Sequence, residues 1–163
     1  MASGLIALGG NLGHVRATFE KAIAEICEKA GAQLKARSFD YATPPWGDTE
    51  QPPFVNACIE IETSLDPHAL LDVLHAIEAA HGRDRQHETR WGPRPLDLDL
   101  IAYDDLTLSE PDLMLPHPRL FERAFVLVPL AQIVPNRIIA GRAVRAALAD
   151  LSTDGIERLP ERR

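Results

Sequence analysis

The sequence has little lysine, and this bears on how it can bind anions. Its 163 residues include three lysines, and all three lie within the first 35 residues, so every later basic residue is an arginine. A phosphate-binding loop that depends on lysine is therefore excluded beyond that point. Any phosphate bound there would be held by guanidinium groups, which suit bidentate contacts with its oxygens.

Cysteines and long apolar runs are also scarce. The two cysteines, Cys27 and Cys58, lie in apolar patterns without a C-x-x-C spacing, which is typical of free buried thiols in a reducing compartment. The N-terminal segment lacks the basic stretch of a secretory signal, and no apolar run approaches the roughly 20 residues that cross a bilayer. We therefore expect a cytoplasmic protein with no membrane contact.

The overall composition indicates an ordinary globular chain. It is 45% hydrophobic and 25% charged with a net charge of -7, and this acidity argues against general nucleic-acid binding, for which a basic surface supplies most of the affinity. The length suits a single domain over residues 1–163. We expect that domain to be a monomer that acts on small molecules.

Hydrophobic periodicity predicts an α+β fold. The segments after residue 104 favour one or two short helices over 116–133, interrupted or restarted at Pro129, then a helix over 141–151 and an edge strand over 155–160. Before them, the predicted order is strand 5–8, helix 14–30, strand 33–41, strand 54–63, helix 66–82 and strand 95–103. This β-α-β-β-α-β order suggests a ferredoxin-like α/β plait, a mostly antiparallel sheet flanked by helices.

The strand over 95–103 carries two aspartates that its packing does not require. Asp97 and Asp99 share one face, about 6.5 Å apart at roughly 3.3 Å rise per residue, while the leucines between and beside them face the core. Like charges this close repel unless a ligand neutralises them, and carboxylates beside phosphate suit Mg²⁺. The alternative is a solvated outer face, because exposed aspartates are common.

The preceding loop favours the ligand. The stretch GRDRQHETRWGPR, residues 82–94, contains Arg83, Arg85, Arg90 and Arg94 against two acidic residues. Arginines beside a carboxylate pair would hold a polyphosphate carrying Mg²⁺, which supplies the positioning and charge neutralisation that phosphoryl transfer needs. The alternative is an exposed loop with local ion pairs.

A histidine that follows the predicted strand 95–103 leaves two interpretations open. His117 lies close to Arg119 and Arg123 in the sequence LPHPRLFER. It is either a structural histidine at a turn or a group that helps these arginines to hold phosphate.

Several motifs together resemble one known family. RWGPRPLDLDLI is similar to the signature of the 6-hydroxymethyl-7,8-dihydropterin pyrophosphokinases of folate biosynthesis, and further segments resemble the family in its order over about residues 5–135. These segments are IALGGNL, YATPPWG, QPPFVNA, LHAIEAAHGR and LPHPRLFERAFVLVPL. The resemblance implies transfer of the terminal pyrophosphoryl group of ATP to the hydroxymethyl oxygen of the pterin, with release of AMP.

The resemblance also implies roles for individual residues. Asp97 and Asp99 would hold two Mg²⁺ ions that bridge the ATP phosphates and the attacking hydroxyl. Arg83 and Arg94 would be the catalytic arginines that neutralise charge on the transferring group. The remaining matches are Glu78, Trp91, Arg94, His117 and Arg123 on the ATP side, and Thr43, Pro45, Phe54, Asn56 and Phe125 in the pterin pocket.

The chemistry of the pterin matches agrees with a flat heterocyclic ligand. Phe54 and Phe125 would supply aromatic faces, and Asn56 can pair with a mixed donor and acceptor edge. The proline-rich loop 43–53 and the arginine loop 83–94 are then expected to close over bound substrates.

The sequence departs from the family at a few positions. Asp112 and Met114 stand where some members carry an arginine and a threonine that contact the nucleotide, and Trp46 stands where a smaller apolar residue is common. The arginine loop is also one residue longer than in some relatives. Asp112, Met114 and the longer loop bear on ATP affinity and the rate of loop closure rather than on the reaction, and Trp46 bears on the entrance of the pocket.

Two other functions are compatible with parts of the pattern. A phosphatase with an aspartate nucleophile also uses a D-x-D pair, but its aspartates end a parallel strand, whereas LIAY continues this strand. A ferredoxin-like module that senses a nucleotide or metal would need the aspartates and arginines but no aromatic pocket. The presence of both sets favours an enzyme with two substrates.

Overall fold

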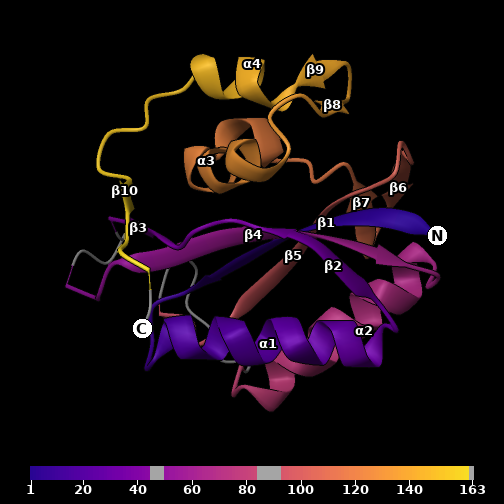
Figure 1. Cartoon of the computed structure of the whole chain (residues 1–163), viewed down its shortest axis with the longest axis horizontal. Coiled ribbons are helices and arrows are strands. Elements are labelled where there is room, and N and C mark those ends of the chain that lie inside the picture. The colour runs from indigo at the N-terminus through magenta and orange to yellow at the C-terminus, as the bar shows by residue number, and fades with distance from the viewer. Residues whose placement is uncertain (45–49, 84–92, 162–163) are drawn as a thin grey trace.

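The computed structural model describes residues 1–44, 50–83 and 93–161, in which a sheet lies between two layers of helices (Figure 1). The elements of its first part are β1 (Ala2–Gly10), α1 (Val15–Lys29), β2 (Gln33–Arg37), β3 (Tyr41–Thr43), β4 (Phe54–Thr63), α2 (Pro67–Ala80) and β5 (Asp97–Tyr103). The predicted β-α-β-β-α-β order is confirmed, with the second strand divided into β2 and β3.

The sheet is built around the long strand β4. One edge of β4 pairs with β1 along its whole length, and its other edge pairs first with β3 and then with β2. The strand order is β10-β3-β4-β1-β5, and β2 also pairs with β4. Strand β10 is the short strand Glu157–Arg158. Every pair in this sheet is antiparallel. The predicted antiparallel sheet flanked by helices is confirmed.

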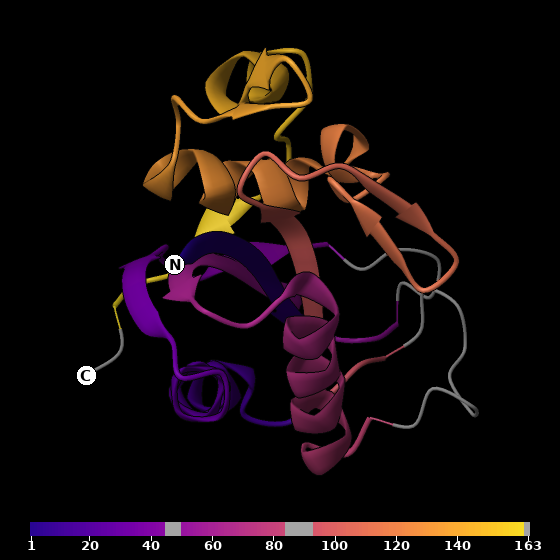
Figure 2. The ribbon, with the colours of Figure 1, turned by 90° about the vertical axis from the view of Figure 1, so that its right-hand side faces the viewer.

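Helices α1 and α2 cover one face of this sheet (Figure 2). Alternation along β4 directs Val55, Ala57, Ile59 and Ile61 into the core beneath these helices. Helix α2 begins where Asp66 caps it by accepting a hydrogen bond from the Ala69 N–H at 2.9 Å. This face is closed by apolar side chains.

The opposite face is covered by the second half of the chain. The helices there are a short 3₁₀ turn (Leu120–Glu122), α3 (Ala124–Ile133) and α4 (Val144–Ala149), and their core includes Leu5 and Ile101. The predicted interruption at Pro129 is wrong, because α3 runs through this buried proline and the break lies at Arg123. Packing against the sheet therefore outweighs the hydrogen bond that a proline cannot donate.

The predicted strand 33–41 is interrupted at Ser38, whose side-chain hydroxyl takes the place of a backbone carbonyl as the hydrogen-bond acceptor. The Ser38 N–H donates to the Cys58 carbonyl at 2.9 Å, and the Ser38 hydroxyl accepts from the Cys58 N–H at 2.9 Å. Asp40, which is buried, follows with ion pairs to Arg16 at 2.8 Å and Arg37 at 3.0 Å. The chain therefore leaves the ladder after β2 and rejoins it at β3.

Two short hairpins were not predicted. The first joins β6 (Leu108–Glu110) to β7 (Leu113–Leu115), and the second joins β8 (Ile138–Ile139) to β9 (Arg142–Ala143). Each strand has two or three residues, too few for a periodic pattern to be recognised.

The described part of the chain includes no helix that is long and apolar enough to cross a membrane. Both cysteines are free thiols, and Cys58 is fully buried, as predicted. Cys27 is only half-buried.

Candidate active site

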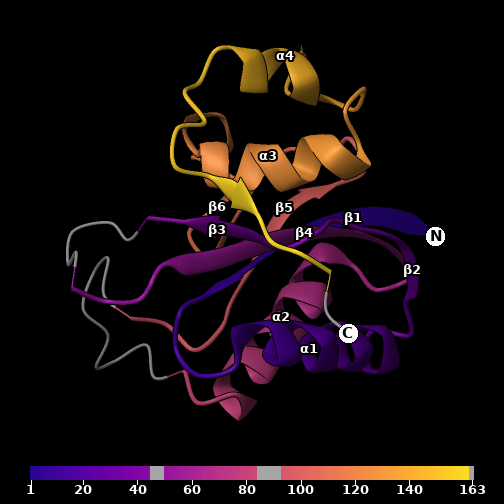
Figure 3. The ribbon, with the colours of Figure 1, turned by 60° about the vertical axis from the view of Figure 1, so that its left-hand side comes forward.

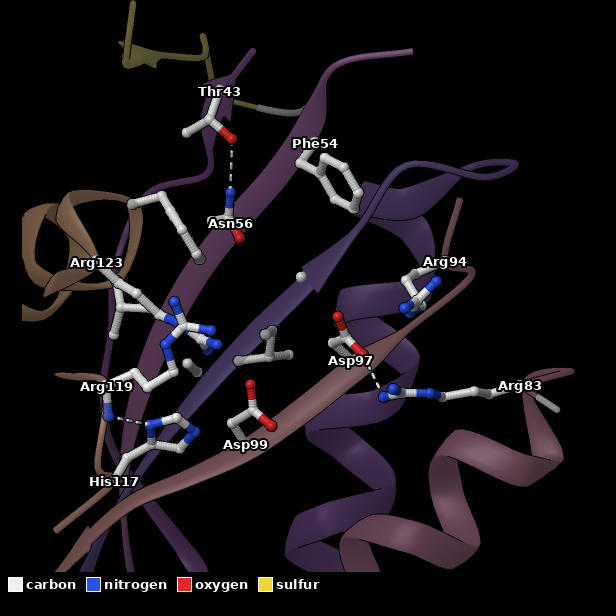
Figure 4. A pocket seen from close by; sticks show the side chains of 15 residues that line it. Thr43, Phe54, Asn56, Arg83, Arg94, Asp97, Asp99, His117, Arg119 and Arg123 are labelled. Carbon is white, nitrogen blue, oxygen red and sulfur yellow. Dashed lines mark hydrogen bonds and ion pairs between the residues drawn. The ribbon is translucent and has the colours of Figure 1, made fainter. Parts of the chain in front are cut away.

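A cleft of about 320 Å³ opens on the α3 side of the sheet, beyond the part that α3 covers (Figure 4). Strands β1, β4 and β5 form its floor, and the segment around α3 forms one wall. It is lined by Ala7, Leu8, Gly9, Thr43, Phe54, Asn56, Arg83, Arg94, Asp97, Asp99, His117, Arg119, Arg123, Phe125 and Val126. Ten of the residues predicted for the site therefore line one cavity.

The two aspartates lie on the cleft face of β5, as predicted. Leu98, between them, is buried in the core against α1 and α2. On the neighbouring strand β1, Asp99 pairs with Ala7 and Asp97 pairs with Gly9. These small partners leave open space beside the carboxylates.

Gly9 is a cleft residue that the sequence analysis missed. A Cβ atom at this position would lie 3.0 Å from the side-chain oxygen of Asn56 and 3.8 Å from Cβ of Asp97. A larger residue would therefore fill the floor between these two side chains. The signal that could have found it is the double glycine in IALGGNL, to which the sequence analysis assigned no role.

Behind the aspartates, Glu78 fixes the free edge of β5. Its side chain is only 1% exposed, and its Oε2 accepts from the Leu98 N–H at 2.8 Å and from Arg83 at 2.6 Å. Arg83 also forms an ion pair with Asp97 (Figure 4). Glu78 thus lies beneath the cleft and holds both the strand that carries the aspartates and one of the arginines.

The negative charges of the carboxylate pair favour binding of a cation. Burial and the neighbouring charge of Asp99 raise the pKa of Asp97 to about 6, against the lowering effect of Arg83. An ionised carboxylate with a raised pKa gains more than an exposed one when a cation approaches. Asp97 and Asp99 are hard oxygen donors on one strand face, and they are the described residues of the cleft best suited to a divalent cation.

The opposite wall carries positive charge. The His117 N–H donates to the Ile101 carbonyl at 2.8 Å, and the His117 Nδ1 accepts from the Arg119 N–H at 3.2 Å. Burial lowers the pKa of His117, with Asp99 raising it and Arg123 and Arg119 lowering it. The imidazole is therefore neutral at neutral pH with its proton on Nε2, so the charge of this wall comes from the two arginines.

The far end of the cleft is suited to a flat polar ligand. The Asn56 side-chain N–H donates to the Thr43 hydroxyl at 3.0 Å, and the ring of Phe54 lies beside them (Figure 4). Phe125 enters from α3, and the guanidinium of Arg123 lies 5.8 Å from its ring centroid. Amide, hydroxyl and aromatic groups thus meet at one end of the cavity that holds the aspartates.

Asn11 is a second residue that the sequence analysis missed. It is buried, and its amide nitrogen donates to the Gln51 side chain at 2.8 Å and to the Pro52 carbonyl at 3.0 Å. Its amide oxygen accepts from the Arg94 N–H at 2.9 Å. Asn11 therefore joins the end of the arginine loop to the end of the proline-rich loop.

The remaining residues named from the sequence are of two kinds. Five of them, Pro45, Trp46, Arg85, Arg90 and Trp91, lie outside the described residues. Asp112 and Met114 are exposed, and neither lines the cleft.

Comparison with known proteins shows one family throughout. The family described as 7,8-dihydro-6-hydroxymethylpterin-pyrophosphokinase matches residues 5–135. A protein of Methylorubrum extorquens named 2-amino-4-hydroxy-6-hydroxymethyldihydropteridine pyrophosphokinase is 49% identical over 98% of this chain and 99% of its own length. A protein of the same name from Pseudomonas aeruginosa is 42% identical over 95% of each chain.

Solved structures show the same fold. The HPPK-DHPS protein of Plasmodium falciparum, crystallised with pteroate, matches 91% of this chain with a TM-score of 0.71 at 13% identity. This chain spans only 42% of that longer protein.

Proposed function

The chain belongs to the 7,8-dihydro-6-hydroxymethylpterin-pyrophosphokinase family, and we propose that it transfers pyrophosphate from ATP to the hydroxymethyl group of 6-hydroxymethyl-7,8-dihydropterin, releasing AMP, in folate biosynthesis. The observation that carries this proposal is that one cavity joins two chemically different ends. One end has carboxylates and arginines, and the other has aromatic rings with an amide and a hydroxyl.

A divalent cation is consistent with an ATP-using enzyme of this family, and we propose that Asp97 and Asp99 hold two Mg²⁺ ions. The residues fit: both carboxylates lie on the cleft face of β5, and Arg83 already places a positive charge against Asp97. When bound, Mg²⁺ supplies charge neutralisation on the phosphate oxygens and orients them.

The arginines would bind and neutralise the phosphate chain. Arg83 and Arg94 border the aspartates and are proposed to face the transferring group, while His117 and Arg123 on the other wall hold the nucleotide. Arg119, which also lines this wall, adds a third positive group to the proposed ATP side. Glu78 acts from beneath by fixing Arg83 and the backbone of Leu98.

The pterin would lie at the far end of the cleft. Phe54 and Phe125 offer ring faces, and Asn56, held by Thr43, offers the paired donor and acceptor that a pterin edge requires. The acceptor hydroxyl would then point along the floor over Gly9 toward the aspartates. We also propose Pro45 for this pocket and Trp91 for the nucleotide side, by resemblance alone.

The rival interpretation as a phosphatase fits the fold less well. Its nucleophilic aspartate ends a strand of a parallel sheet, whereas β5 begins at Asp97, continues to Tyr103 and is antiparallel to β1. We further propose that residues 1–163 form one pyrophosphokinase domain, monomeric and cytoplasmic, with no nucleic-acid partner; the net charge of -7 supports the last point.

A product assay tests the function directly. The purified protein is incubated with Mg²⁺, ATP and 6-hydroxymethyl-7,8-dihydropterin, and the nucleotides are separated. We expect AMP that depends on the pterin, without ADP. Nucleotide binding without AMP would mean that the cleft serves another acceptor or binding alone.

A further inference from the structure

The end of the chain returns to the sheet beside the proposed pterin pocket. After α4 it passes α3 and crosses the sheet edge, where β10 pairs with β3, Glu157 with Ala42 and Arg158 with Tyr41 (Figure 3). The Leu159 N–H then donates to the Asp40 carbonyl at 2.9 Å. We refer to residues 155–160 as the C-terminal strap.

Two arginine side chains fasten the second half of the strap. The guanidinium of Arg158 lies 3.5 Å from the ring centroid of Phe39, a close cation–π contact. Arg16 donates to the Pro160 carbonyl at 2.5 Å and to Asp40 at 2.8 Å, so one arginine of α1 holds both the strap and the segment before β3.

The first residue of the strap lies directly against Pro44. Gly155 has a φ of +82°, and a Cβ atom there would lie 2.9 Å from Cγ of Pro44. The left-handed backbone and the close approach both require glycine. Pro44 follows Thr43, so this contact reaches the pocket wall.

Among the residues that the structure describes, a hollow rather than a packed layer lies behind the pocket wall, so the wall needs this support. Strand β3 has three residues, and behind Thr43 and Phe125 is a second hollow of about 390 Å³. Its other side is formed in part by Ser152, Asp154 and Ile156, at the approach to the strap and within it. A wall with a cavity behind it keeps its position only through the elements that fasten its edges.

We propose that the C-terminal strap is a positioning element for the acceptor pocket. By pairing with β3 and contacting Pro44, it fixes the position of Thr43 and, through the hydrogen bond between them, the position of the Asn56 amide. This inference rests on the proposed pterin site and extends it to residues beyond 135, which the family match does not include. The contacts of the strap described above go to Pro44, Asp40, Phe39, Arg16 and β3, not to the aspartates, so we expect its effect to fall on the acceptor.

The test is steady-state kinetics with ATP and 6-hydroxymethyl-7,8-dihydropterin varied in turn. In Arg158→Ala and in Gly155→Ala we expect the KM for the pterin to rise about tenfold, as small displacements of positioning groups do, with the KM for ATP and kcat unchanged. Arg158→Lys, which keeps a cation over Phe39, should restore most of the affinity.

Arg142→Ala is the matched control. Arg142 also stacks on a phenylalanine, Phe121 at 4.9 Å, and pairs with Asp150 at 2.7 Å, but it does not line the cleft. We expect both KM values to stay at the wild-type level in this variant.

Three results would overturn the inference: equal changes in both KM values, a change in kcat alone, or an unchanged pterin KM despite faster amide hydrogen exchange at residues 41–43. Failure of the proposed function is distinguishable, because the wild-type protein would then form no pterin-dependent AMP.

Discussion

The two faces of the sheet are made by the same strands but have opposite characters. Against α1 and α2, β5 buries Leu98 and Leu100 in an apolar core. On the other side of the same strand, Asp97 and Asp99 line the cleft. On the second face α3 covers only part of the sheet, over Leu5 and Ile101. The cleft is the part of this face that the helix leaves uncovered.

This comparison shows how a small fold combines stability with a reactive site. The closed face gains free energy from apolar burial, whereas the open face keeps a carboxylate whose raised pKa records an unfavourable charge. Adjacent residues of one strand thus have separable roles, which substitutions can test.

The largest effect is expected on the open face. Asp97→Ala and Asp99→Ala should each lower turnover by about 10³-fold or more, since each removes charge that orders the phosphates. The measurement is AMP formation, with circular dichroism to verify the fold. Near-normal activity in a folded Asp97→Ala protein would remove the metal assignment.

The matched change on the closed face is Leu98→Ala. It should lower the free energy of unfolding by about 2–5 kcal/mol, because a fully buried leucine leaves a cavity, while the folded fraction keeps its pterin-dependent turnover. Urea unfolding measures the first quantity and the AMP assay the second. A loss of activity with stability unchanged would contradict the division of roles between the faces.

A smaller effect is expected at the cleft wall. Arg119→Ala should raise the KM for ATP about tenfold, the loss of one hydrogen bond to a charged group, and leave the KM for the pterin unchanged. Arg145→Ala, an exposed arginine on α4, is the control. Equal ATP affinity in the two variants would exclude Arg119 from the nucleotide site.

The smallest effect is expected on stability, because the ionised carboxylate of Asp97 on the open face lowers the free energy of unfolding. The pKa of Asp97 is raised to about 6 in the folded protein, so the folded state binds the carboxyl proton more tightly than the unfolded chain does. Above that pH the ionised carboxylate therefore disfavours folding. In metal-free protein, Asp97→Asn should raise the free energy of unfolding at pH 8 by on the order of 1 kcal/mol. The gain should fade as pH falls through 6 toward 4; a gain independent of pH would mean that charge is not its cause.

Much of the fold was predictable because the sequence records it locally. The strand over 54–63, the alternation in β5 and the helix that begins at residue 66 depend on neighbouring residues, and the structure confirms them. The division of the second strand was not predictable, because it depends on Ser38 meeting Cys58 from another strand. The helix through Pro129 likewise depends on packing that the local pattern does not record.

The site also has residues that local sequence marks and residues that only tertiary contacts mark. The D-x-D pair and the arginines carry a recognisable chemical pattern, whereas Asn11 and Gly9 have no chemistry of their own to mark them. Asn11 matters because Gln51 and Arg94, far apart in the sequence, meet at its amide. Gly9 matters because a Cβ atom there would lie only 3.0 Å from the side-chain oxygen of Asn56, on another strand.

The sequence by itself determined the β-α-β-β-α-β order of the first part of the chain, the strand face that the two aspartates share, and the family, because periodicity and motif chemistry are properties of neighbouring residues. Only the tertiary structure decided that Glu78 lies beneath the cleft, that Arg119 lines it, and that the C-terminal strap closes onto β3. These contacts join residues widely separated along the chain, so their geometry exists only once the sheet and its helices have packed together.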